Sequence, residues 1–182
     1  GNNPLIVWNA ANLDAAALLT IQSAYQTTGQ RCSCARRLII EQGPRGDALV
    51  SRLLELIPRI RVGPYTDRPE PFMGPLVRAQ AADNALAAQQ RLIEQGARPL
   101  QPMSRPSSIH PPSSPIAFLT PGLLDVATIT PPDEEIFAAL LQVIRVPDFE
   151  AALTAASHTA FGLCAALISD DAALYRRFFT RI

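Results

Sequence analysis

Short apolar runs recur along the chain and are separated by longer segments of more mixed character. Runs of this length with little polar alternation are typical of strands that are buried on both faces of a sheet. Pro, Gly, Asn or Asp residues bound most of them, as expected where a strand gives way to a turn. The pattern predicts strands at residues 5–8, 37–40, 98–101, 116–119, 123–128, 140–146 and 164–168.

The segments between these runs carry apolar residues at helical spacing. Asn12 and Asp148 are favourable N-cap residues, Pro44 suits a first helical turn, and Gly96 suits the position just after a last one. The pattern predicts helices after Asn12, after Pro44, over 76–95 and after Asp148, a helical turn over 131–137, and a last helix opened by Asp170 or Asp171.

Strands that alternate with helices favour an α/β domain whose sheet is largely parallel. Each connecting helix returns the chain to the end of the sheet where the previous strand began, so the next strand runs in the same direction. We therefore expect a layered α/β/α domain with a mostly parallel sheet. Residues 61–75 and 102–115 are rich in Pro, and we expect surface segments there, the second a flexible loop. No second domain boundary is evident in 182 residues.

Composition narrows the class of protein. The 16 basic residues are balanced by 16 acidic ones, which argues against a nucleic-acid partner. No apolar run approaches the ~18 residues of a membrane span, so we expect no membrane partner. An odd count of 3 cysteines without metal-ligand spacing predicts free thiols in a reducing, cytoplasmic compartment and no metal site.

The stretch Gly29-Gln30-Arg31-Cys32-Ser33-Cys34 is the most informative chemically. Backbone N–H groups at a turn and nearby arginines stabilise a thiolate, and the same N–H groups can hold an oxyanion. Cys32 is therefore a candidate nucleophile. The alternative is that Cys32 and Cys34 are small buried hydrophobic residues. A Cys-x-Cys metal pair lacks partners, because both histidines, His110 and His158, lie far away in sequence. Cys164 lies in an apolar run and is expected in the core.

Residues 133–137, Asp-Glu-Glu-Ile-Phe, allow two interpretations. Acidic side chains in a first helical turn interact favourably with the helix dipole. A carboxylate can also accept two hydrogen bonds from a ribose diol, and a neighbouring Phe can pack against a nicotinamide ring. Composition does not choose between these two.

Several short motifs together resemble the aldehyde dehydrogenase superfamily over essentially the whole chain. Residues 1–7 resemble the segment after the family's Glu-Leu-Gly-Gly signature, and residues 29–32 resemble its Gly-Gln-x-Cys nucleophile motif. Residues 134–137 resemble the Glu-Glu-x-Phe cofactor motif, and Phe161-Gly162-Leu163 a later landmark. Residues 19–24, 30–38 and 119–125 resemble the branch that oxidises N-succinylglutamate 5-semialdehyde in arginine breakdown.

This resemblance implies covalent catalysis with NAD, or NADP, as the hydride acceptor. Cys32 would attack a small-molecule aldehyde, a hydride would leave the hemithioacetal, and water would release the acid from the thioester. Glu135 would hold the nicotinamide ribose and Phe137 would pack beside the ring. Arg31 is a candidate anchor for a substrate carboxylate, although a structural or solvent-facing role is an equal alternative.

The resemblance also predicts what this chain lacks. We expect residues 1–182 to be the Cys-bearing catalytic domain, without the general-base Glu, the N-terminal NAD-binding domain and a C-terminal segment. The full-length protein is then expected to be a homo-oligomer, and the fragment alone inactive. Ala138-Ala139 stand where the family usually has Gly-Pro. That departure leaves open a dehydrogenase of another substrate class, or a non-catalytic module that keeps the fold.

Overall fold

The computed structural model describes residues 1–107 and 117–182. Within them a six-stranded sheet has the order β3-β4-β5-β2-β1-β6. Only the β3–β4 pair is antiparallel, and the other neighbouring strands are parallel. The strands are β1 (Pro4–Val7), β2 (Arg37–Glu41), β3 (Arg98–Gln101), β4 (Gly122–Asp125), β5 (Leu140–Val146) and β6 (Ala166–Ile168).

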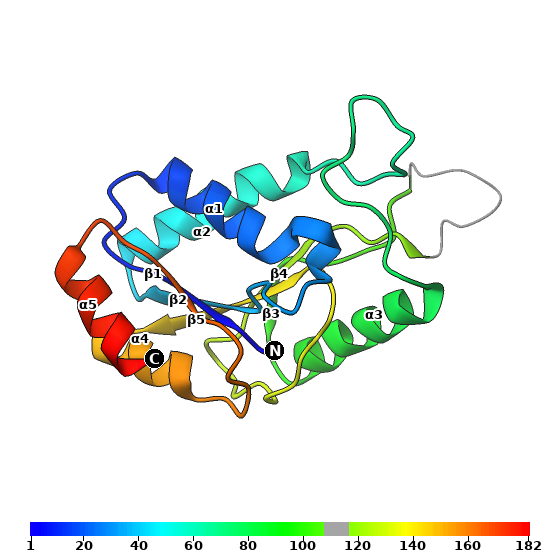
Figure 1. The fold of residues 1–182 in the computed structure, drawn as a ribbon. Helices are drawn as coiled ribbons and strands as arrows, with labels where there is room; N and C mark the ends of the chain where they lie inside the picture. Colours follow the sequence, from blue (N-terminus) through cyan, green and yellow to red (C-terminus); the bar gives the residue numbers. More distant parts are fainter. Residues whose placement is uncertain (108–116) are drawn as a thin grey trace.

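Helices cover both faces of this sheet (Figure 1). The helices α1 and α2 lie on one face, and α3, α4 and α5 lie on the other. The predicted layered α/β/α architecture is thus confirmed. The helices are α1 (Leu13–Tyr25), α2 (Pro44–Leu56), α3 (Ala79–Glu94), α4 (Phe149–Ser157) and α5 (Ala172–Arg181), with short 3-10 turns η1 (Gln26–Gly29) and η2 (Ile57–Arg59).

In the central strands, successive residues enter different cores, which is why these apolar runs lack polar alternation. Leu5 and Leu38 pack among the side chains of α1 and α2, whereas Ile6 and Ile39 pack among those of α4 and α5. A third cluster seals α3 against the β3–β4 end of the sheet. The strands are therefore fixed from both faces, and they give the loops at their ends a rigid base.

The helix starts predicted after Asn12 and Asp148 are confirmed by their capping bonds, whereas α3 begins at Ala79 and not at residue 76. The Asn12 side chain accepts from the Ala15 amide at 3.0 Å, and Asp148 accepts from the Ala151 amide at 2.8 Å. Asp171, rather than Asp170, caps the last helix. Gly96 has a φ of +109°, the left-handed conformation that ends α3.

Three element predictions were wrong. The segment 131–137 forms no helical turn, because Asp133 does not cap a helix and instead accepts from Asn2, Thr159 and the Ala160 amide. Residues 117–119 form no strand, and residue 116 and the loop residues 108–115 lie outside the described residues. The segment 61–75 is more than a surface loop, because Met73 is fully buried in the core beneath it.

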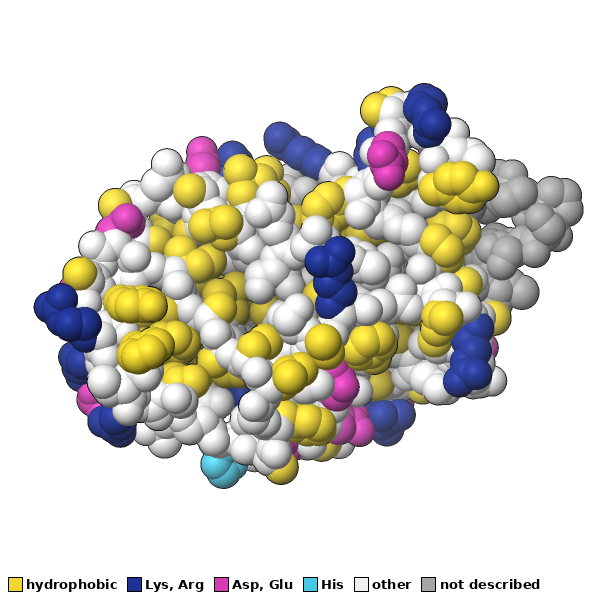
Figure 2. Space-filling model, in the orientation of Figure 1, with side chains coloured by type: hydrophobic (Ala, Val, Ile, Leu, Met, Phe, Trp, Pro, Cys, Tyr) yellow, Lys and Arg dark blue, Asp and Glu magenta, His cyan; other side chains and the backbone are white. Residues whose placement is uncertain are grey.

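The surface agrees with the balanced composition. Figure 2 shows one face, on which hydrophobic side chains alternate with isolated charged groups of both signs. In the described part of the chain no helix is both long and apolar enough to cross a bilayer.

Asp125, at the end of β4, is buried among three donors. Arg98 Nη2 and Arg145 Nε lie 3.1 and 3.0 Å from its carboxylate, and the Ala127 amide lies 3.0 Å away. Burial alone would raise the pKa of Asp125, but these donors outweigh it and lower the pKa below its ordinary 3.8. The carboxylate therefore stabilises the fold above the pKa of the unfolded chain, and this stabilisation is lost as the pH falls through the lower folded pKa.

Asp125→Asn is expected to lower the free energy of unfolding by about 3 kcal/mol at neutral pH, because it removes the buried carboxylate that pairs with the partly buried Arg145 and the exposed Arg98. The difference from wild type should shrink below about pH 3.8. Urea unfolding across this pH range measures both effects. Asp47→Asn is the matched control, since Asp47 is an exposed carboxylate on the same Arg145. Equal effects of the two substitutions, or a pH-independent loss for Asp125→Asn, would contradict this account.

Candidate active site

The loop that carries Cys32 is built from an unusual run of left-handed residues. Thr27, Thr28 and Gly29 have φ values of +56°, +59° and +70° and turn the chain sharply within η1, just after α1. Two of them are not glycine, and such a conformation persists only where the surroundings hold it. Beyond this turn Cys32 is exposed and Cys34 is buried. Burial as a small hydrophobic residue therefore describes Cys34 but not Cys32.

Asn3, the residue just before β1, holds the Cys32 loop. Its Nδ2 donates to the carbonyl oxygens of Cys32 at 2.6 Å and Cys34 at 2.9 Å. Its own carbonyl accepts from the Arg36 amide at 2.9 Å. Among the described residues the Cys32 amide N–H donates to no other group, so it is free to serve an oxyanion. Sequence reasoning missed Asn3, whose role follows from the parallel register of β1 and β2.

The two buried arginines that follow the loop have different functions. The guanidinium of Arg36 donates to the carbonyl oxygens of Gly29 at 2.6 Å, Arg31 at 3.2 Å and Ala138 at 3.3 Å. The guanidinium of Arg37 turns away and donates to Asn2 and to two carbonyls at the C-terminal end of α4. The positive potential expected near Cys32 therefore comes from Arg36 and not from Arg37.

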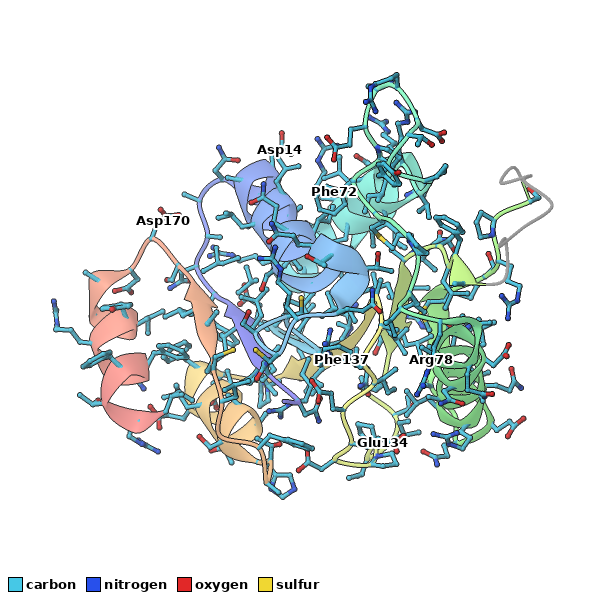
Figure 3. All side chains as sticks on the ribbon, turned by 45° about the vertical axis from the view of Figure 1, so that its right-hand side comes forward. Asp14, Phe72, Arg78, Glu134, Phe137 and Asp170 are labelled. Carbon is cyan, nitrogen blue, oxygen red and sulfur yellow. The ribbon has the colours of Figure 1, made fainter. Side chains whose placement is uncertain are left out.

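The segment with Glu135 and Phe137 lies against the Cys32 loop. Arg36 Nη2 is 3.8 Å from Glu135 Oε1, and its guanidinium carbon lies 5.3 Å from the centre of the Phe137 ring. Figure 3 shows Phe137 between the sheet and α3. The Gly1 nitrogen lies 2.6 Å from the same Glu135 oxygen. Glu135 Oε1 is buried and, among the described residues, has no partner with hydrogen-bond geometry.

A cavity of about 280 Å³ separates this segment from α3. Its wall combines two carboxylates, one arginine, one aromatic ring and apolar helix positions, which suits a flat, hydroxyl-bearing ligand. Glu134 is ion-paired with Arg91 at 3.2 Å, and both line the cavity. The residues that line the cavity include Gln30, Val77, Asn84, Glu135 and Phe137.

Asp133, just before this segment, anchors it rather than taking part in the site. Desolvation would raise the pKa of Asp133, but hydrogen bonds from Asn2, Ala160 and Thr159 lower it. An ionised Asp133 ties the segment to the chain after α4, through bonds of 2.7 Å from Thr159 Oγ1 and 2.6 Å from the Ala160 amide. Asp133 is therefore stabilised by these tertiary hydrogen bonds and not by a helix dipole, which was one interpretation of the sequence.

Arg31 points toward a second cavity. Its Nε donates to Thr27 Oγ1 at 2.8 Å, and the side chain is exposed. This cavity, of about 560 Å³, is formed with residues from the segment 61–75, among them Tyr65 and Phe72. Among the described residues the two terminal guanidinium nitrogens of Arg31 have no hydrogen-bond partner, so they are free to bind an anion.

Cys164 was expected in the core and is instead exposed, because β6 begins only at Ala166. Its thiol is 3.6 Å from the Ser33 carbonyl, beside the Cys32 loop. Partial burial raises the pKa of Cys164 above its usual range, and the nearby Cys32 adds to this rise. Within the described ranges, no group of three His, Cys, Asp or Glu side chains is arranged to hold a metal ion.

The fold and site together define a class: an α/β domain that presents an exposed thiol on a strained loop beside a carboxylate and an aromatic ring. The family model described as the aldehyde dehydrogenase family matches residues 1–182, and the chain belongs to this family.

Individual relatives agree with this assignment. The chain is 52% identical over its whole length to N-succinylglutamate 5-semialdehyde dehydrogenase 1 of Caulobacter vibrioides, and 47% identical over 98% of its length to the N-succinylglutamate 5-semialdehyde dehydrogenase of Ectopseudomonas mendocina. It spans 37% and 36% of those relatives.

Solved structures show the same fold. Methylmalonate-semialdehyde dehydrogenase from Oceanimonas doudoroffii superposes with a TM-score of 0.90 at 27% identity. A 1-pyrroline-5-carboxylate dehydrogenase from Thermus with bound NAD gives 0.87 at 29% identity. Both matches cover the whole of this chain and, respectively, 37% and 34% of the other chain.

Proposed function

We propose that this chain is the nucleophile-bearing domain of an NAD-dependent aldehyde dehydrogenase that oxidises N-succinylglutamate 5-semialdehyde. The observation that carries the proposal is that the exposed Cys32 loop and the Glu135–Phe137 segment, distant in sequence, lie together through the contacts of Arg36. Identities of about half to relatives with this named activity support the substrate.

In this proposal Cys32 is the nucleophile. Its thiolate adds to the aldehyde carbon, and the free Cys32 amide N–H donates to the oxygen that becomes negative. Loss of a hydride from the carbon leaves a thioester on Cys32, which water then hydrolyses to the carboxylic acid and the free thiol. The base that activates this water would lie outside residues 1–182.

The residues present fit the nicotinamide end of NAD, which accepts the hydride when bound. Glu135 offers a carboxylate that can accept hydrogen bonds from a ribose diol, and its buried Oε1 lies 2.6 Å from the Gly1 nitrogen. Phe137, 46% exposed, offers a ring face beside the same cavity. Ala138 and Ala139, which stand in place of Gly-Pro, are both buried. The Ala138 carbonyl accepts a hydrogen bond from Arg36 Nη1.

We further propose that the remaining dinucleotide-binding fold and the oligomer contacts belong to chain outside residues 1–182. The lengths of the relatives, of which this chain spans little more than a third, support this division. A cytoplasmic location suits three free thiols.

The substrate assignment predicts a preference that can be measured. The full-length protein should reduce NAD with N-succinylglutamate 5-semialdehyde at a kcat/KM about a hundredfold above that with the unacylated semialdehyde, because the site would bind the added carboxylate. Arg31→Gln should raise KM for the succinylated substrate and leave the unacylated one nearly unchanged, if Arg31 binds that carboxylate. Equal kcat/KM values for both aldehydes would reject the substrate assignment. No NAD reduction with any aldehyde would reject the proposed function.

A further inference from the structure

Arg36 is a charged side chain in a place where charge is costly. It is 1% exposed, the most deeply buried charged residue among those described. Burial lowers the pKa of its guanidinium, which the neighbouring Cys34 and Glu135 oppose. A guanidinium in such a position needs partners for its donors, and a plain apolar residue of similar size is often at least as stabilising. The groups that accept hydrogen bonds from Arg36 therefore indicate the role of this buried guanidinium.

The partners of Arg36 come from two segments. Gly29 and Arg31 lie just before Cys32 on the loop, and their carbonyls accept from Arg36 Nη2 at 2.6 and 3.2 Å. Ala138 belongs to the segment 102 residues further along the chain, and its carbonyl accepts from Nη1 at 3.3 Å. The single planar guanidinium of Arg36 thus fixes the distance between the Cys32 loop and the segment that contains Ala138.

The same guanidinium also faces the groups assigned to the cofactor. It lies 3.8 Å from Glu135 and stacks over the Phe137 ring. The positive charge attracts the Glu135 carboxylate, and the stacking limits the positions of the ring. A displacement of Glu135 or Phe137 is therefore transmitted through one rigid group to the carbonyls beside Cys32.

We propose that Arg36 is a positioning residue that couples the Cys32 loop to the cofactor-facing segment Glu135–Phe137. The inference rests on the proposed function, because Glu135 and Phe137 are taken to meet the nicotinamide end of NAD. It goes further by assigning to Arg36 the coupling between occupancy of that segment and the reactivity of the thiol. Arg36 itself touches neither the reacting carbon nor the cofactor in this assignment.

Two readouts on the full-length protein test the coupling without turnover. The first is the Kd for NAD, measured by titration calorimetry. The second is the rate at which iodoacetamide alkylates Cys32, followed by mass spectrometry of its peptide with and without NAD. In the wild type, saturating NAD is expected to change this rate severalfold. In Arg36→Gln, the Kd for NAD should rise about tenfold or more, and the alkylation rate should become nearly independent of NAD.

Arg37→Gln is the matched control. Arg37 is also buried and also donates to three backbone carbonyls, but these are those of Asn2, Ala155 and Ala156. Both substitutions should lower Tm, whereas only Arg36→Gln should remove the response of the thiol to NAD. If Arg36→Gln does not fold, Arg36→Lys replaces it, because one ammonium keeps the charge but does not reproduce the planar fork.

The possible outcomes distinguish the coupling role of Arg36 from the proposed aldehyde dehydrogenase function. Arg36 variants with a lowered Tm and an unchanged NAD response would show a structural arginine and overturn the inference. A wild-type thiol that is indifferent to NAD would overturn it as well. In both cases wild-type aldehyde oxidation can persist, so the proposed function survives. Loss of NAD binding in the wild type would instead reject the proposed function.

Discussion

Cys32→Ser in the full-length protein should reduce kcat for aldehyde oxidation by at least about a thousandfold, because the hydroxyl is a far weaker nucleophile than the thiolate. The fold should be unaffected, since Cys32 is exposed and makes its one described loop contact, with Asn3, through its backbone carbonyl. Steady-state NAD reduction measures the loss, and unfolding curves of the two proteins should coincide.

The chain offers two matched controls for this substitution. Cys34→Ser changes a buried thiol two residues away, and Cys164→Ser changes an exposed thiol beside the same loop. We expect both to keep kcat within a few-fold of wild type. Iodoacetamide should label Cys32 faster than Cys164, whose raised pKa keeps it protonated near neutral pH. Comparable slow labelling of all three thiols would favour a non-catalytic module. A near-normal kcat for Cys32→Ser would instead show that Cys32 is not the nucleophile.

The elements that the sequence predicted well are those decided by neighbouring residues. Asn12, Asp148 and Asp171 cap helices with their own side chains, and a local pattern suffices to find them. The apolar runs became strands because both faces of the sheet are covered, which the runs themselves indicate. The antiparallel pairing of β3 with β4 had no such local signal.

The wrong predictions for residues 131–137 and for Cys164 share one cause, which is the pairing of these segments with residues far along the chain. Asp133 has the composition of a helix start, but Asn2 and Thr159 take its carboxylate. Cys164 lies in an apolar run, but pairing with β1 starts only at Ala166, so the thiol is left outside. A pattern of neighbouring residues contains no information about these partners.

The candidate site divides in the same way. Cys32, Glu135 and Phe137 were found because their motifs are short and local. Asn3 and Arg36, which hold the loop, were not assigned these roles, because their side chains act on backbone carbonyls of other segments. Every residue has a backbone carbonyl, so the sequence does not indicate which carbonyls accept hydrogen bonds from Asn3 and Arg36. These contacts become visible only once the register of β1 and β2 is known.

Gly29→Ala is expected to disrupt this support more than any other change to the loop outside Cys32. A Cβ at Gly29 would lie 2.3 Å from the Ala138 carbonyl oxygen and 2.8 Å from the Ala139 nitrogen. Both are buried backbone atoms, so the loop itself has to move, and the left-handed φ of +70° adds strain. We expect kcat/KM to fall about a hundredfold and stability to fall by about 3 kcal/mol.

Gly43→Ala separates the clash from the backbone strain. Gly43 also has a positive φ, +99°, but a Cβ there would meet nothing within 4 Å. Its substitution should cost about 1–3 kcal/mol of stability through strain alone, with the Cys32 alkylation rate unchanged. Gly29→Ala should change that rate as well, because the carbonyls beside Cys32 shift relative to Arg36. If Gly29→Ala lowers stability no more than Gly43→Ala and leaves the alkylation rate at its wild-type value, the close packing of Gly29 on Ala138 does not position the thiol.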